Sequence, residues 1–204
     1  RIDTGKMMVT FDRGDYWQCA YVIAKGQYEA VRAAGLDAFR DNIVGMAPIL
    51  KSGMADVKTW DDVKLLTVAI NRLKRWTLPG LLCIGDAAHA MSPVGGVGVN
   101  LAVQDAVATA NLLAAKLING CPPEDVLDAV RLRREFPVRM TQTMQVAVQN
   151  NIISAALKPG DRPLRAPLFA RIINAVPWLQ GVTARFVGLG VRPEHVRSPE
   201  APNP

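Results

Sequence analysis

The residues best able to do chemistry lie in one run, from Gly85 to Leu101. Asp86 follows a glycine and the apolar residues 81–84, in the position of a turn after a short buried strand. A carboxylate in such a turn can accept hydrogen bonds from sugar or polyol hydroxyls, and a charged acceptor makes bonds roughly twice as strong as a neutral one. The alternative is that Asp86 caps its own turn.

Downstream of Asp86, glycines interrupt the chain before a long helix. Gly95, Gly96 and Gly98 would let the backbone approach a flat ligand closely. The helix expected from about Val99 has unpaired N–H groups and a partial positive charge at its start, which suits an anion. The run therefore predicts a ligand site with hydroxyls near Asp86 and negative charge near the start of the helix.

Other interpretations of the same run are weaker. Gly96 to Leu101 lacks the last glycine of a GxGxxG dinucleotide fingerprint. Asp86 and His89 supply too few ligands for a metal ion, and we interpret His89 as a packed or hydrogen-bonded residue. A hydrolytic triad of Asp86, His89 and Ser92 is disfavoured because triad members come from separate elements. We therefore expect neither a metal site nor a catalytic side chain.

The elements that must position this run have mixed periodicity. Residues 7–12 and 16–24 have the composition of strands, and Arg13-Gly14-Asp15 between them indicates a hairpin. Residues 28–44 have helical spacing, whereas residues 65–71 and 81–84 are expected as further strands. Strands come before helices without an alternating βαβ series, so the order favours an α+β fold.

Long helices are expected after the glycine-rich run. The first should end just before Gly120, and the next should run to about Leu157 with a kink or break near Pro137. One or two short helices, divided at Pro177, are expected within residues 164–187. This organisation divides the chain into four expected segments: a sheet and helix (1–72), the strand, turn, glycine-rich loop and helix (73–120), a helical region (121–190) and a frayed tail (191–204).

Composition limits the classes of partner. A chain of 204 residues, half of them hydrophobic, can bury a globular core. The net charge of +6 is scattered, and the densest basic cluster, in residues 131–139, has no alternating aromatic residues, so we expect no nucleic-acid partner. The most apolar long segment, residues 97–118, contains Asn100 and Asp105, which are costly inside a bilayer, so we expect no membrane span.

The cysteines and the first residues bear on location and extent. Cys19, Cys83 and Cys121 are odd in number and far apart, and they form neither a CxxC pair nor a zinc spacing. Reduced thiols and a cytoplasmic location are therefore expected. The sequence starts Arg1-Ile2-Asp3 without a methionine, so we expect it to belong to a longer protein.

The run from Arg75 to Leu113 resembles a known family. Arg75-Trp76-Thr77-Leu78-Pro79-Gly80, and then GDAAHAMSPVGGVGVNLAVQDA, are similar to the second FAD-binding motif of the class A flavoprotein monooxygenases, the p-hydroxybenzoate hydroxylase-like aromatic hydroxylases. The resemblance extends over about residues 7–150, and Tyr16-Trp17-Gln18 is similar to the family's substrate-domain sheet. It implies part of an α/β FAD/NAD(P)-binding monooxygenase fold, with antiparallel substrate-domain strands, a flavin loop and long C-terminal helices.

The resemblance also implies roles for single residues. Asp86 would bind the ribityl chain of FAD, Pro93 would border both flavin and substrate, and backbone amides of the glycine-rich loop would approach the flavin ring. The implied cofactor-binding residues are Asp86, Pro93, Gly95, Gly96, Val97, Gly98, Val99 and Asn100. The implied substrate-binding residues are Tyr16, Gln18, Pro93 and Val94.

The implied reaction is hydroxylation of an aromatic or similarly electron-rich small molecule. NAD(P)H would reduce the flavin, and O₂ would form a flavin C4a-hydroperoxide, so no protein residue need act as a covalent catalyst. Another flavin oxidoreductase of the same fold, such as a halogenase or reductase, remains an alternative. A non-catalytic fragment that acts as an interaction module is a further alternative, and a homodimer is left open.

The sequence departs from the family in one large respect. The family's opening strand, GxGxxG turn and helix, which hold the ADP part of FAD, have no match here, and the middle Asp-Gly motif is also absent. We therefore expect an N-terminal FAD-binding half as a partner. Without that half, the chain is expected neither to hold FAD tightly nor to turn over.

Overall fold

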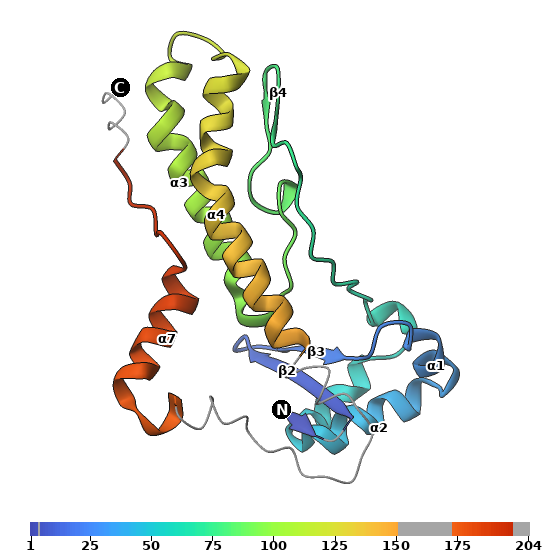
Figure 1. The fold of residues 1–204 in the computed structure, drawn as a ribbon. Coiled ribbons are helices and arrows are strands. Elements are labelled where there is room, and N and C mark those ends of the chain that lie inside the picture. The colour runs from blue at the N-terminus through green and yellow to red at the C-terminus, as the bar shows by residue number, and fades with distance from the viewer. Residues whose placement is uncertain (4, 151–172, 198–204) are drawn as a thin grey trace. The chain divides into compact units, whose positions relative to one another are not determined.

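A computed structural model describes residues 1–3, 5–150 and 173–197. The described residues fall into two compact units, drawn in Figure 1: 1–66 with 148–150, and 67–147 with 173–197. We expected segment boundaries at 72, 120 and 190, whereas this division keeps residues 73–120 in one unit with the helix that follows them. Helices combined with small antiparallel sheets confirm the α+β class.

The first unit begins with an antiparallel sheet. Its strands are β1 (Ile2–Asp3), β2 (Lys6–Asp12) and β3 (Trp17–Val22), in that order. The register of β2 and β3 runs from Met7 opposite Val22 to Asp12 opposite Trp17, which confirms the expected hairpin. In its loop the Gly14 amide donates to Asp12 Oδ1 at 2.8 Å.

Short helices follow the sheet. They are α1 (Tyr28–Ala33) and α2 (Leu36–Met46), then the 3₁₀ turns η1 (Pro48–Leu50), η2 (Ser52–Asp56) and η3 (Trp60–Asp62). The single helix expected over residues 28–44 is therefore wrong. The chain breaks at Gly35, which has φ +93°, a left-handed conformation that glycine alone adopts without strain.

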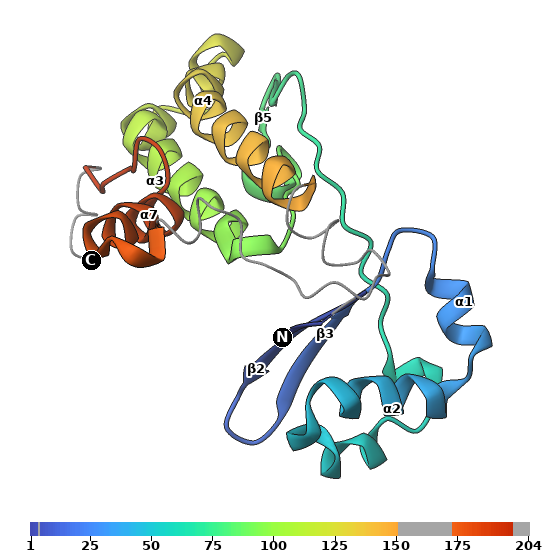
Figure 2. The same cartoon turned by 60° about the horizontal axis from the view of Figure 1, so that its bottom comes forward.

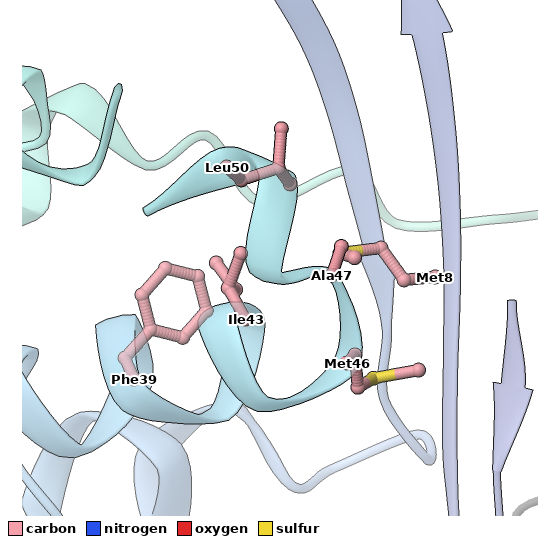
Figure 3. Packing of buried hydrophobic residues seen from close by; sticks show 6 residues of the cluster. All are labelled: Met8, Phe39, Ile43, Met46, Ala47 and Leu50. Carbon is pink, nitrogen blue, oxygen red and sulfur yellow. The ribbon is translucent and has the colours of Figure 1, made fainter. Parts of the chain in front are cut away.

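The core of the first unit forms where α2 meets β2. Figure 3 shows its buried residues, which are Met8, Phe39, Ile43, Met46, Ala47 and Leu50. Phe39, Ile43 and Met46 recur at the spacing of one helix face, so α2 buries a single apolar stripe. The Phe39 ring also contacts Tyr21 edge-on, with 5.9 Å between centroids. One helix face, one strand and the turns after the helix therefore make this core.

In the second unit, strands are scarce. The strand expected at residues 65–71 is wrong, because this stretch has no ladder and only isolated bonds, such as Asn71 N–H to Ala90 O at 3.2 Å. A short hairpin follows, made of β4 (Thr77–Leu78) and β5 (Leu81–Leu82), so the strand expected at 81–84 is two residues long. The 3₁₀ turns η4 (Gly85–Ala87) and η5 (Val94–Gly96) come next.

Long helices dominate the rest of this unit. α3 (Val97–Leu117) and α4 (Glu124–Val148) lie side by side, as Figures 1 and 2 both show, and α7 (Pro177–Leu189) packs against α3. α4 continues through Pro137, so the expected break is absent there. The expected helix end near Leu157 and the region 164–172 lie outside the described residues. Pro177 is the first residue of α7, where a missing N–H costs least.

α3 is the core helix of this unit. Leu113 of α3 packs with Leu127 and Val130 of α4, and Leu82 and Ile84 pack against them. Among the described helices, α3 alone is long and apolar enough to cross a membrane. Core helices pass the same test, so length and composition alone do not make α3 a membrane span. The absence of a membrane span stays a prediction, and the buried charge described below favours it.

Candidate functional site

Gly85 lies at the closest approach between the turn η4 and helix α3. The chain arrives extended at Ile84 and then adopts φ +57° at Gly85. A Cβ added to Gly85 would lie 3.0 Å from the Cβ of Ala102 on α3, which is tighter than most real Cβ contacts. Both the backbone angle and the contact therefore favour glycine here.

Asp86 is the next residue, and its side chain is exposed. Within the part of the chain that the structure describes, its carboxylate makes no hydrogen bond or ion pair. The alternative that Asp86 caps its own turn thus has no bond to support it. The turn presents a carboxylate whose acceptor sites are available to a ligand.

A buried charge cluster holds this turn in place. We call Asp105, His89, Arg134 and the Gly85 amide the Asp105 cluster. Asp105 Oδ2 accepts the Gly85 N–H at 3.0 Å and lies 2.6 Å from His89 Nε2, while Oδ1 accepts Arg134 Nε at 2.9 Å. The three side chains are at most 1 % exposed. The cluster therefore joins η4, α3 and α4 through one carboxylate.

The electrostatics of Asp105 favour its charged form. Burial by itself raises the pKa of this carboxyl. Hydrogen bonds from His89 and Arg134, the charge of His89 and the bond from the Gly85 amide together outweigh burial, so the pKa of Asp105 lies below its ordinary value. The prediction that His89 is a packed, hydrogen-bonded residue is confirmed, since its ring also lies 5.2 Å from that of Trp76.

The glycine-rich loop joins η5 to the start of α3. Gly95 has φ +80° and Gly96 has φ +63°, and both are exposed. Because the left-handed Gly96 is the N-cap, α3 begins at Val97, two residues before the expected start at Val99. No side chain caps this helix end, so its N–H groups and dipole are free of a capping side chain, as an anion site requires.

The other cofactor candidates differ in exposure. Pro93 and Val99 are exposed and Val97 is buried. A Cβ placed on Gly98 would lie 3.7 Å from the Cβ of Met91. Asn100 donates its side-chain amide to Gly188 O of α7 at 3.0 Å, so its backbone is what remains for a ligand. η4 packs against α3 and η5 leads into it, so the structure brings the cofactor candidates to one end of α3.

The substrate candidates are split between the two units. Pro93 and Val94 belong to the second unit, at η5. Tyr16 and Gln18 belong to the first unit, and both are exposed. Tyr16 lies in the hairpin loop rather than in the strand, and Gln18 Oε1 accepts a hydrogen bond from the Arg13 guanidinium at 2.8 Å. Their role in substrate binding stays a prediction.

Sequence reasoning missed the residues behind the turn and loop. From the sequence, Asp105 was interpreted only as a residue that is costly inside a bilayer, and Arg134 only as part of the basic cluster in residues 131–139. Gln142 and Gln145 of α4, which bond to the backbone near the loop, were not considered. The available signal was a polar residue on the apolar face of a helix, which has to find a buried partner.

A family whose profile is described as "FAD binding domain" matches residues 16–144. The chain belongs to the class A flavoprotein monooxygenases. This confirms the family expected from the motif at Gly85 to Leu101.

Relatives of this flavoprotein monooxygenase chain carry matching names. The chain is 30 % identical over 172 residues to the 6-methylpretetramide 4-monooxygenase of Streptomyces rimosus. This match covers 80 % of the chain and 41 % of the relative. The chain is 34 % identical over 149 residues to the rifampicin monooxygenase of Rhodococcus hoagii, covering 63 % and 30 %. The FAD-dependent monooxygenase atmM of Aspergillus flavus is 28 % identical, covering 76 % and 33 %. The chain thus spans 41 % or less of the length of these relatives.

Gly85 can be tested against a glycine that differs only in its surroundings. Gly85→Ala should lower the free energy of unfolding by more than Gly80→Ala. Both have positive φ, which costs an alanine about 1–2 kcal/mol, but a Cβ at Gly80 meets nothing within 4 Å. Urea unfolding of both variants measures the difference. Equal losses would show that the contact with Ala102 is unimportant.

Asp105→Asn should lower the free energy of unfolding at pH 7 by about 3–5 kcal/mol, because the buried Arg134 guanidinium loses its nearest charged partner and is left with Glu194 at 3.7 Å. Asp128→Asn is the matched control, since Asp128 pairs with Arg131 at the surface and its loss should cost under about 1 kcal/mol. Urea unfolding of both variants provides the comparison.

The wild type and Asp105→Asn also give a pH test of this prediction. The folded-state pKa of Asp105 lies below the unfolded value of about 3.9, so its stabilisation is present above that pH and is lost as the pH falls through the folded pKa. The stability gap between the wild type and Asp105→Asn should therefore narrow below about pH 4. A gap that stays constant down to pH 3 would contradict the charged assignment.

Proposed function

We propose that this chain is the C-terminal part of an FAD-dependent monooxygenase. The whole protein would use NAD(P)H and O₂ to hydroxylate an aromatic or similarly electron-rich small molecule. The observation that carries the proposal is the exposed carboxylate of Asp86, which has no partner among the described residues, on a turn whose backbone is fixed by the buried Asp105. Family membership supports the same conclusion.

The residues present fit FAD on the chemistry of their donors and acceptors. Asp86 offers acceptors for the hydroxyls of a polyol chain. Among the described residues, no atom lies within 4 Å of a Cβ placed on Gly96, and the uncapped start of α3 offers N–H donors and a positive dipole end. FAD has both matching parts, since its ribityl chain carries hydroxyls and its reduced ring carries negative charge.

Each part of the site would then have one task. Asp86 would hold the ribityl hydroxyls, and amides between Gly96 and Asn100 would bind the anionic edge of the ring. When bound, FAD would supply electron transfer from NAD(P)H and the activation of O₂. Residues 93–99 are proline, valine and glycine, which have no side-chain proton donor or acceptor. The loop would therefore contribute orientation and exclusion of water rather than acid–base catalysis.

The remaining parts of the proposal concern partners. Two relatives are named for acting on 6-methylpretetramide and on rifampicin. We propose a small aromatic substrate here, and the residues proposed to bind it are Pro93, Val94, Tyr16 and Gln18. The chain spans under half of its relatives, so the ADP part of FAD would be held by an N-terminal half. A cytoplasmic location with reduced cysteines is part of the same proposal.

Asp86→Ala should raise the dissociation constant of FAD at least about tenfold, since a hydrogen bond to a charged group contributes about 1.5–3 kcal/mol. The measurement is a fluorescence titration of FAD against the longest natural polypeptide that contains this chain. Asp125→Ala, which removes another exposed carboxylate from the same unit, should leave the constant unchanged. Unchanged affinity in Asp86→Ala would reject the role of this carboxylate.

The reaction class has its own test. The same polypeptide, supplied with NADH or NADPH, candidate aromatic substrates and ¹⁸O₂, should give products that contain one ¹⁸O atom per hydroxylation, as mass spectrometry can show. Incorporation is expected because a monooxygenase takes the new oxygen from O₂. Substrate turnover without ¹⁸O in the product would point instead to a reductase or halogenase.

A further inference from the structure

Two glutamines of α4 face the chain immediately before the glycine-rich loop. Gln142 and Gln145 are three residues apart, so they lie on the same face of the helix. Their exposed fractions are 5 % and 3 %, and Ser92, to which Gln145 bonds, is 3 % exposed. Buried amides of this kind are held by hydrogen bonds, and here the partners include backbone groups of the segment before the loop.

Gln145 makes two bonds to one residue. Its Nε2 donates to Ser92 O at 2.8 Å, and its Oε1 accepts from Ser92 N–H at 3.2 Å. Two residues in an antiparallel sheet exchange hydrogen bonds in the same way, so the side-chain amide takes the place of a neighbouring strand. The direction of the peptide groups on both sides of Ser92 is therefore fixed from α4.

Gln142 fixes the chain slightly earlier. Its Nε2 donates to Ala90 O at 3.2 Å and to Asn71 O at 2.8 Å, and its Oε1 accepts from Arg72 at 3.0 Å. It thereby ties the extended segment at Asn71 to the segment at Ala90. Together the two glutamines hold residues 90–92 against α4.

The loop that follows makes a backbone hydrogen bond within itself, from Gly96 N–H to Pro93 O at 3.1 Å, but its composition gives it little further rigidity. Pro93 has no N–H to donate, and Gly95 and Gly96 have the widest backbone freedom of any residue type. Val97 already belongs to α3, so residues 93–96 span the distance between two anchors. The downstream anchor is the helix, and the upstream anchor is Ser92 as held by Gln145.

We propose that Gln145, supported by Gln142, is a positioning residue for the loop that receives the flavin ring. This inference rests on the proposed function of the loop. An amide suits the task because it donates and accepts at once and adds no charge beside a ring that becomes anionic. An ionised glutamate at position 145 could still accept from Ser92 N–H but could not donate to Ser92 O.

The test uses FAD-loaded polypeptide of the length defined above and two substitutions. Gln145→Leu should weaken FAD binding about tenfold and alter the visible circular dichroism of the bound flavin at every pH. Gln145→Glu should resemble Gln145→Leu at pH 8. As the pH falls and the side chain gains a proton, its affinity and flavin spectrum should return to those of the wild type, because the donor to Ser92 O is restored.

The controls separate positioning from stability. Thr143→Ala lies on an exposed part of α4, where Thr143 bonds to Arg139 O of its own helix, and it should change neither affinity nor spectrum. A merely structural Gln145 would shift the melting temperature without a pH-dependent return of the spectrum in Gln145→Glu, and that result would overturn the proposal. If Gln145→Leu does not fold, the pH series of Gln145→Glu decides alone.

The outcome is distinguishable from failure of the proposed function. Wild-type affinity and spectrum in both Gln145 variants, with weakened binding in Asp86→Ala, would overturn the positioning role and leave the function standing. Failure of the wild type itself to bind FAD would overturn both.

Discussion

The carboxylate of Asp105 is the group on which the second unit depends. An ionised carboxylate removed from water is costly unless it is paired and hydrogen-bonded, so the chain has to bring donors to it from every side. The donors come from the η4 turn, from His89 just after it and from Arg134 on α4. Satisfying one charge thus fixes how the turn, α3 and α4 meet, and Asp86 inherits its position from that arrangement.

In the second unit, side-chain amides hold extended segments by hydrogen bonds, as neighbouring strands do in a sheet. The second unit has one hairpin of two-residue strands among its described residues, yet its extended segments are held in place. Gln142 and Gln145 hold the segments at Ala90 and Ser92, and Gln104 of α3 donates to the carbonyl of Leu189, the last residue of α7. Such bonds fix the backbone locally without requiring a sheet beside it, which leaves the loop at Pro93 open on its other side.

The sequence was informative where a pattern has a local cause. Turn residues predicted the β2–β3 hairpin, and apolar periodicity predicted the long helices. The lack of enough metal ligands near His89 predicted that it is packed and hydrogen-bonded. The Asp105 cluster could not be predicted, because Asp105 is 16 to 29 residues away from its partners and the partner of a buried charge depends on how helices pack. The apolar composition of 65–71 indicated a strand, but a strand also needs a neighbour, which composition does not reveal.

The contact between Gly85 and Ala102 has a consequence for the orientation of α3 about its own axis. The side chain that faces the turn is the small one of Ala102, and its neighbours Leu101 and Val103 are both much larger. Turning the helix by one residue, about 100°, would press one of them into η4. The contact therefore fixes the rotation of α3 about its own axis. That rotation decides which of the first-turn amides face the loop and which face the protein.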